Sequence, residues 1–245
     1  MPSIYILANG VMAQALAHGL KDNYEVIFVG RNLSKLSSLK EQGFKTLLYE
    51  NFNLDDKNVI LAFKPYAFDE VSTLLRGEAK ILISVLANTN LNKLSSIKAQ
   101  NIVRIMPNIA AKYKVSATPF VLKNEKFKDE ILAILQSFGY AYELDNEEQM
   151  PVATAICGCG PAFLAMVAES IAGGGVLEGL NKNLSYDLTK ALFKSTSELL
   201  KHEHPAIIKE NVCSPAGVSI KGVRALEKNG IRTAFFEAIS ASSNK

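Results

Sequence analysis

The chain has no tryptophan and only three cysteines among 245 residues. These cysteines are Cys157, Cys159 and Cys213. Three thiols are too few for the disulfide framework of a small secreted domain, and a Cys-x-Cys pair lacks the further ligands of a zinc site. His202 and His204 flank Glu203 at a spacing that does not place both rings on one helical face. We therefore expect no metal site and small, packed thiols.

The excess of positive over negative charge is also small, with a formal net charge of +3. Lysines and arginines are scattered, without the interleaved aromatic residues of a nucleic-acid platform. The first residues have no basic region before their apolar run, which is typical of a strand and not of a signal peptide or membrane span. These absences predict a soluble cytoplasmic protein with no nucleic-acid or membrane partner.

The N-terminal segment reads as strand, tight turn and helix. An apolar run over residues 4–7 is followed by Ala8-Asn9-Gly10, and helical periodicity begins at Met12. This order is that of a dinucleotide-binding unit, in which the pyrophosphate lies on the helix N-terminus. Ala8 occupies the position of the first fingerprint glycine, whereas Gly10 is kept, so an ordinary strand–helix turn is the alternative.

The second strand, residues 25–29, bears on the choice of cofactor. An NAD site places an acid at this strand end to bind the ribose 2′-hydroxyl. The chain has Arg31 and Asn32 there instead. Because a guanidinium binds a 2′-phosphate through paired charged hydrogen bonds, NADP(H) is the expected cofactor and NAD(H) the alternative. The alternative for Arg31 itself is an arginine in a solvated loop that binds no ligand.

Apolar strands and helical segments then alternate to residue 144, which predicts a doubly wound, mostly parallel, Rossmann-like α/β sheet. Strands are expected over 45–48, 59–63, 80–86, 102–106, 115–122 and 140–144, and helices over 34–42, 67–75, 91–99 and 126–138. Ligands of such sheets lie beyond the carboxyl ends of the strands. The cofactor-binding residues expected on this basis are Leu7, Ala8, Asn9, Gly10, Val11, Met12, Arg31, Asn32, Ala62, Lys64, Pro65 and Asn108.

The rest of the chain has helical spacing, over residues 162–177, 185–201 and 218–239. A polar run near residue 147 marks the expected boundary, with a dinucleotide-binding domain over 1–147 and an all-α domain over 148–245. About a hundred helical residues with several apolar faces rarely form a compact monomer, so we expect helices paired with those of a second copy.

A distinctive loop, Val212 to Gly222, lies between two of these helical segments. Ser214-Pro215 starts a turn, and Gly217 is expected to adopt a backbone conformation that other residues disfavour. The helix that follows presents free N–H groups and a positive dipole, which suit a carboxylate. A plain helix cap is the structural alternative.

Taken together, the motifs resemble those of Δ1-pyrroline-5-carboxylate reductases. They are Gly10-Val11-Met12-Ala13, Ala62-Phe63-Lys64-Pro65, Arg104-Ile105-Met106-Pro107-Asn108, Gly158-Cys159-Gly160-Pro161-Ala162 and Ser214-Pro215-Ala216-Gly217-Val218-Ser219-Ile220. The resemblance implies NAD(P)H-dependent reduction of a cyclic imino acid to L-proline. It also implies a helical domain that builds homodimers, which in this family often assemble into decamers.

The resemblance also implies site residues. The substrate-binding residues would be Ser214, Ala216, Gly217, Val218, Ser219 and Glu169, and the Ser219 hydroxyl would lie near the ring nitrogen as the catalytic group. Ala8 and Ala216 depart from the family's glycines. Two other readings stay open: another NADP-linked reductase of the β-hydroxyacid dehydrogenase kind, which uses a helix lysine as acid, and a non-catalytic nucleotide-binding paralogue.

Overall fold

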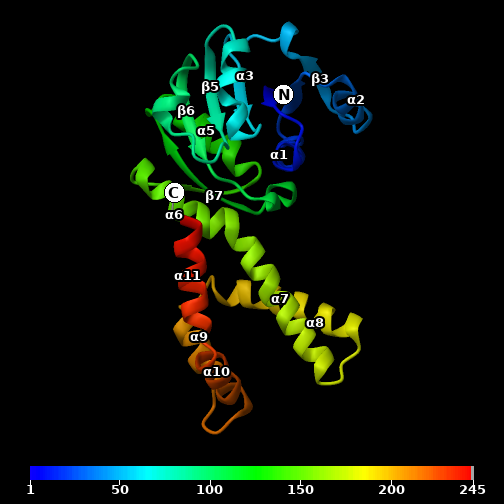
Figure 1. The fold of residues 1–245 in the computed structure, drawn as a ribbon, viewed down its shortest axis with the longest axis vertical. Coiled ribbons are helices and arrows are strands. Elements are labelled where there is room, and N and C mark those ends of the chain that lie inside the picture. Colours follow the sequence, from blue (N-terminus) through cyan, green and yellow to red (C-terminus); the bar gives the residue numbers. More distant parts are fainter. Residues whose placement is uncertain (244–245) are drawn as a thin grey trace. The chain divides into compact units, whose positions relative to one another are not determined.

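Eight strands form one sheet in the N-terminal part of the chain, which Figure 1 shows in blue to green. The structure, a computed structural model, describes residues 1–243. The strands are β1 (Ser3–Leu7), β2 (Glu25–Gly30), β3 (Lys45–Leu48), β4 (Asn58–Leu61), β5 (Ala79–Ser84), β6 (Ala99–Ile105), β7 (Ser116–Leu122) and β8 (Gly139–Glu143). Their order is β3-β2-β1-β4-β5-β6-β7-β8, and every neighbouring pair is parallel except β6 and β7. The predicted Rossmann-like sheet is confirmed, with β7 and β8 added to its six-stranded order.

Both faces of the sheet are buried at its central strands, which explains why β1, β2, β4 and β5 are largely apolar. Successive side chains alternate between the faces: Ile4 and Ile6 pack in one core cluster, whereas Leu7 packs in the other. The helices between the strands are α1 (Val11–Leu20), α2 (Leu33–Glu41), α3 (Phe68–Leu74), α4 (Leu91–Leu94) and α5 (Lys128–Gln136), with short 3-10 helices η1 (Tyr49–Asn51), η2 (Pro65–Ala67) and η3 (Ile109–Tyr113). The two cores hold the strand ends, and the loops that follow them, in fixed positions.

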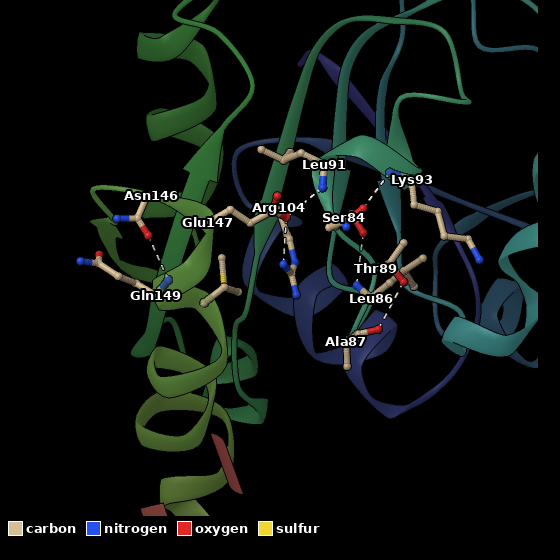
Figure 2. Close-up of polar contacts among 12 residues, drawn as sticks. Ser84, Leu86, Ala87, Thr89, Leu91, Lys93, Arg104, Asn146, Glu147 and Gln149 are labelled. Carbon is tan, nitrogen blue, oxygen red and sulfur yellow. Dashed lines mark hydrogen bonds and ion pairs between the residues drawn. The ribbon is translucent and has the colours of Figure 1, made fainter. Parts of the chain in front are cut away.

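Polar and apolar contacts fix the segment after the last strand to the sheet (Figure 2). Glu147 begins η4 (Glu147–Gln149), and its Oε1 accepts hydrogen bonds from Arg104 Nη1 and from the backbone N–H of Leu91, both at 2.8 Å. Met150, the first residue of α6 (Met150–Thr154), is fully buried against Met106. This segment therefore belongs to the sheet's unit, which extends to Gly158.

A π-helical turn over Ala155–Cys159 follows α6. The side-chain amide of Asn108 donates a hydrogen bond to the Cys157 carbonyl at 2.9 Å. The second compact unit of the chain, from Cys159 onward, is helical. Its helices are α7 (Gly160–Leu177), α8 (Lys182–Leu199), α9 (Pro205–Val212), α10 (Val218–Lys228) and α11 (Ile231–Ser243). The domain boundary expected after residue 147 stays a prediction.

The glycines of α7 allow a close approach to α8. Gly173 to Gly175 do not interrupt the helix, which continues to Leu177. A Cβ at Gly175 would lie 2.3 Å from Ser185 Oγ, and this hydroxyl donates a hydrogen bond to the Ala172 carbonyl at 2.8 Å. The glycines therefore allow α7 and α8 to pack closely without a break in α7.

The helical unit has almost no interior of its own. Among its described residues only Ala172, Ser185 and Thr189 are buried. On α8 the side chains of Leu184, Leu188 and Leu192 recur every four residues and form one exposed stripe. The stretch Glu147–Leu177 is long and apolar enough to span a bilayer, and only 11% of its most apolar window is buried. These faces require a covering partner.

Several element ends differ by one to three residues from the sequence predictions, and the following differences are larger. The helix expected over 91–99 ends at Leu94, and Ala99 already begins β6. The single helical segment expected over 218–239 is two helices, because Gly230 takes a φ of 72° and ends the first one. The short helix α9, which begins with Pro205, was not predicted.

Candidate functional site

A cleft of about 900 Å³ lies at the carboxyl ends of the central strands. It is lined by the loops after β1, β2 and β4 and by Val85, Ala87 and Ile109 beyond β5 and β6. The chain runs outward from β1 in one direction through β2 and β3, and in the other from β4 onward. Ligands of open parallel sheets bind at this reversal of strand order. The volume suits a small organic ligand or cofactor.

The turn after β1 gives the cleft a helix N-terminus. Gly10 is the N-cap of α1 and has no side-chain capping hydrogen bond. A Cβ built at Gly10 would meet no atom within 4 Å, so the space above this backbone is open. The Gln14 side chain donates a hydrogen bond to the Asn9 carbonyl at 2.9 Å and holds the turn. Exposed N–H groups and the helix dipole favour a phosphate here.

The charged side chains that line the cleft are all cations. They are Arg31 and Lys35 after β2, and Lys64 after β4. Asn32 caps α2 by accepting a hydrogen bond from the Lys35 backbone N–H at 3.0 Å, which orders this corner. Tyr49 lies beside them, and burial raises the pKa of its hydroxyl to about 12. Tyr49 therefore stays a neutral hydrogen-bonding group at physiological pH.

Arg31 also has a partner that sequence reasoning did not find. Its guanidinium forms an ion pair with the carboxylate of Glu70, in the first turn of α3. The two residues are 39 positions apart, and only the packing of α3 brings them together. No local sequence pattern near Arg31 contains this acid.

Most of the predicted cofactor-binding residues lie together in the cleft. The lining includes Ala8, Asn9, Gly10, Val11, Met12, Arg31, Asn32, Ala62, Lys64 and Pro65. Leu7 is fully buried in the core beneath the turn and does not line the cleft. Asn108 does not line it either, because its amide bonds the Cys157 carbonyl and its Oδ1 accepts from the Ala110 N–H. Asn108 supports the cleft from below, through the backbone next to Ile109.

The loop before α10 is a tight turn. The Gly217 N–H donates to the Ser214 carbonyl at 3.0 Å, with Pro215 and Ala216 between them. Ala216 has a φ of 59°, as the third residue of a type II turn requires. The expectation that Gly217 takes the disfavoured conformation was wrong, since its φ is −66° and its ψ 173°.

Gly217 is needed for a different reason. A Cβ at this position would lie 2.4 Å from Ser214 Oγ and 3.1 Å from the Ser214 carbonyl oxygen. Glycine therefore allows a close approach within the turn, while an alanine occupies the left-handed position that normally favours glycine. The disfavoured conformation predicted for Gly217 is therefore found at Ala216.

The turn presents the N-terminus of α10. Gly217 is the N-cap, and no side chain caps the helix. Val218 begins the first turn and is exposed, whereas Ser219 is half-buried. The first N–H groups of such a helix have no intrahelical partners, so they can bind a carboxylate. Glu169 is an exposed residue of α7.

Within residues 1–243, no group of three or more histidines, cysteines, aspartates or glutamates could hold a metal ion. The cysteines are free thiols, and burial raises the pKa of Cys157. A raised pKa keeps this thiol protonated and poorly reactive.

The chain resembles known proteins over its whole length. A family model described as pyrroline-5-carboxylate reductase dimerisation matches residues 147–245, and one described as NADP oxidoreductase, coenzyme F420-dependent, matches residues 3–88. A pyrroline-5-carboxylate reductase of Helicobacter pylori is 34% identical, with 100% of this chain and 99% of that protein covered.

Solved structures give the same result. The 1-pyrroline-5-carboxylate reductase of Streptococcus pyogenes superposes with a TM-score of 0.86 at 26% identity, covering 98% of this chain and 96% of that one. A Plasmodium falciparum pyrroline carboxylate reductase with NADP bound superposes with a TM-score of 0.81 at 26% identity, over 98% and 96% of the two chains.

Proposed function

The chain belongs to the pyrroline-5-carboxylate reductase family, and we propose that it uses the cleft for the cofactor and the loop before α10 for the substrate. As an oxidoreductase of this family it reduces Δ1-pyrroline-5-carboxylate to L-proline, the last step of proline biosynthesis. The observation that carries this conclusion is the match over the full length of the chain. The lysine-dependent hydroxyacid dehydrogenase reading has no comparable support.

The cofactor is NADP(H), with NAD(H) as a weaker alternative. The residues of the cleft fit this cofactor. The uncapped start of α1 and the open space at Gly10 suit the pyrophosphate, and the cations Arg31 and Lys35 suit a 2′-phosphate. When bound, NADPH supplies the hydride that reduces the imine carbon. The protein's own task is to hold and orient the two ligands.

The loop before α10 binds the carboxylate of the imino acid. The N–H groups of Val218 and Ser219 lie at an uncapped helix start, where they and the helix dipole stabilise an anion. The turn from Ser214 to Gly217 fixes the direction in which this helix begins. Binding by backbone groups selects for a carboxylate and leaves the ring free to be oriented by side chains.

The Ser219 hydroxyl orients the ring nitrogen and assists its protonation. A protonated imine is the stronger electrophile, so the site needs the nitrogen protonated when it is reduced. A serine hydroxyl is a weak acid, and solvent is therefore the final proton source. Glu169 is the acid that the family resemblance associates with the substrate site, and its position on α7 is exposed in the single chain.

The dimerisation match over residues 147–245 accounts for the exposed apolar faces. We assign these faces to a homodimer, with a decamer as a larger assembly, and place the enzyme in the cytoplasm. The apolar stretch Glu147–Leu177 then packs against a second copy instead of lipid. No membrane or nucleic-acid partner is part of this proposal.

A steady-state assay of the purified protein tests the reaction. With pyrroline-5-carboxylate, NADPH should be oxidised and L-proline formed in equal amounts, and 3-hydroxy acids with NADP⁺ should give no reduction of the cofactor. Turnover of the hydroxy acids would favour the dehydrogenase reading. Binding of NADPH without turnover of either substrate would favour a non-catalytic paralogue.

A further inference from the structure

We propose that Glu70 sets the cofactor selectivity of this enzyme, by competing with the 2′-phosphate of NADPH for the guanidinium of Arg31. The proposal rests on the proposed binding of the dinucleotide in the cleft. It assigns a role to an acid that no motif contains and that is not itself one of the residues lining the cleft.

The contact follows from the topology of the sheet. Arg31 lies directly after β2, and α3 follows β4, and these two strands flank β1 on either side. Glu70 is in the first turn of α3, so its carboxylate reaches the end of β2 and pairs with Arg31 Nη1. The fold thus supplies in space the acid that is missing in sequence from the end of β2.

The surrounding charges make Glu70 distinctive. The other charged residues that line this part of the cleft, Lys35 and Lys64, are cations. Asp69, the neighbour of Glu70 in the same helical turn, pairs with Lys93 at 2.9 Å and not with Arg31. Glu70 is therefore the acid that pairs with Arg31 where a 2′-phosphate would bind.

The ion pair is exposed, which allows it to be exchanged. The side chains of Arg31 and Glu70 are 71% and 57% exposed, and exposed pairs contribute little to stability. A 2′-phosphate carries up to two negative charges and binds a guanidinium through two hydrogen bonds, so it can displace the carboxylate. The displaced carboxylate still lies nearby and repels the phosphate.

NADH meets a different balance at the same place. Its ribose has a 2′-hydroxyl, which gains no charge attraction from Arg31 and suffers no repulsion from Glu70. A carboxylate can accept a hydrogen bond from this hydroxyl, as the acid at the end of the second strand does in NAD sites. Glu70 therefore lowers the preference for NADPH and supports the use of NADH.

Equilibrium binding of NADP⁺ and NAD⁺ to the full-length protein, measured by calorimetry at one salt concentration, tests this role without turnover. Glu70→Gln should tighten NADP⁺ binding about three- to tenfold and leave NAD⁺ binding unchanged or weaker. Asp69→Asn is the matched control, because it removes one negative charge from the same helical turn; it should change the ratio of the two affinities less than twofold. In an Arg31→Ala background, most of the gain from Glu70→Gln should disappear.

An unchanged ratio of affinities in Glu70→Gln, or an equal effect of Asp69→Asn, would overturn the role of Glu70. If the wild-type protein bound neither dinucleotide, the proposed function itself would fail. Normal binding of NADP⁺ to wild type combined with an unchanged ratio would remove only this inference. The circular dichroism and thermal unfolding of each variant verify that the overall fold is retained.

Discussion

At the scale of single residues, the account depends on one hydroxyl and a few backbone N–H groups at the start of α10. Ser219 is half-buried and follows an uncapped helix start. A hydroxyl in such a place can bind a ring nitrogen without strong competition from water. It cannot act as a strong acid, so its contribution is limited to orientation and hydrogen bonding.

Replacing Ser219 with alanine should lower kcat/KM for the imino acid. The decrease should correspond to a loss of about 1–3 kcal/mol of transition-state stabilisation, since a hydrogen bond to the reacting group is lost. NADPH binding should not change. Ser195→Ala is the control, because this exposed hydroxyl of α8 bonds only the Leu192 carbonyl of its own helix. Wild-type kinetics in Ser219→Ala would remove the residue from the mechanism.

The turn before α10 gives a paired prediction. Gly217→Ala introduces a Cβ 2.4 Å from Ser214 Oγ and 3.1 Å from the Ser214 carbonyl oxygen, so the serine side chain must rotate, the turn must shift by a few tenths of an ångström, and KM for the imino acid should rise about fivefold or more. Ala216→Gly relieves a left-handed alanine and should raise the free energy of unfolding by about 0.5–1 kcal/mol, with little effect on KM. Steady-state kinetics and urea unfolding measure the two effects. An unchanged KM in Gly217→Ala together with a lower stability in Ala216→Gly would contradict this description of the turn.

At the scale of elements, a polar cluster ties α5 to the middle of the sheet. Glu130 on α5 accepts hydrogen bonds from Asn58 of β4 at 2.8 Å and from Lys80 of β5 at 2.5 Å. Burial alone would raise the pKa of Glu130, but the hydrogen bonds from Lys80 and Asn58 outweigh it and lower the pKa below its usual value. The carboxylate is therefore favoured in the folded state.

This lowered pKa predicts an acid-dependent loss of stability. The contribution of Glu130 is complete above the pKa of the unfolded chain, about 4.3, and is lost as the pH falls through the lower folded value. Urea unfolding between pH 3 and 7 should show an extra loss of about 1 kcal/mol in wild type that Glu130→Gln lacks. Glu125→Gln, which removes an exposed acid that pairs with Lys128, should leave the wild-type pH dependence in place.

The elements differ in how far the sequence predicts them. The central strands were found because their runs are apolar on both faces, and β3 also matches its predicted bounds. The end of α4 was missed because Ile97 continues the helical spacing of Leu91 and Leu94, although the chain has already turned toward β6. Two other boundaries that were missed do have local sequence signals. Gly230 is a typical residue after a helix end, and Pro205 is a typical first residue of a helix.

In the cleft, too, some residues could be predicted from local sequence, whereas others depend on contacts between distant segments. Its loop residues could be predicted because parallel strands end at one edge of the sheet. Asn108 has the same sequence signature but is taken up by the Cys157 carbonyl, which lies 49 residues away. The contact of Arg31 with Glu70 also depends on tertiary packing, so no reading of a single motif could find it.

At the scale of the whole molecule, the helical unit is incomplete as a single chain. Leu184, Leu188 and Leu192 are 50%, 52% and 47% exposed on one face of α8, and this unit buries few of its own residues. An apolar stripe of this kind is stable only when a partner covers it. The match to a dimerisation family over these residues supports assembly of the chain through this unit.

Leu188→Asp should therefore disrupt assembly. Burying an aspartate in an apolar interface costs several kcal/mol, so light scattering at micromolar concentration should show monomers or a loss of helical signal. Lys194→Asp changes an exposed position of the same helix and should keep the wild-type mass. A wild-type assembly for Leu188→Asp would place the interface on other faces of the unit.

The most direct test of the central claim is a crystal structure of the enzyme with NADP⁺ and L-proline. The account predicts the pyrophosphate at Gly10, the proline carboxylate on the N–H groups that begin α10, and the Ser219 hydroxyl within hydrogen-bonding distance of the proline nitrogen. Either a nucleotide bound away from Gly10 or a Ser219 hydroxyl remote from the proline would contradict it.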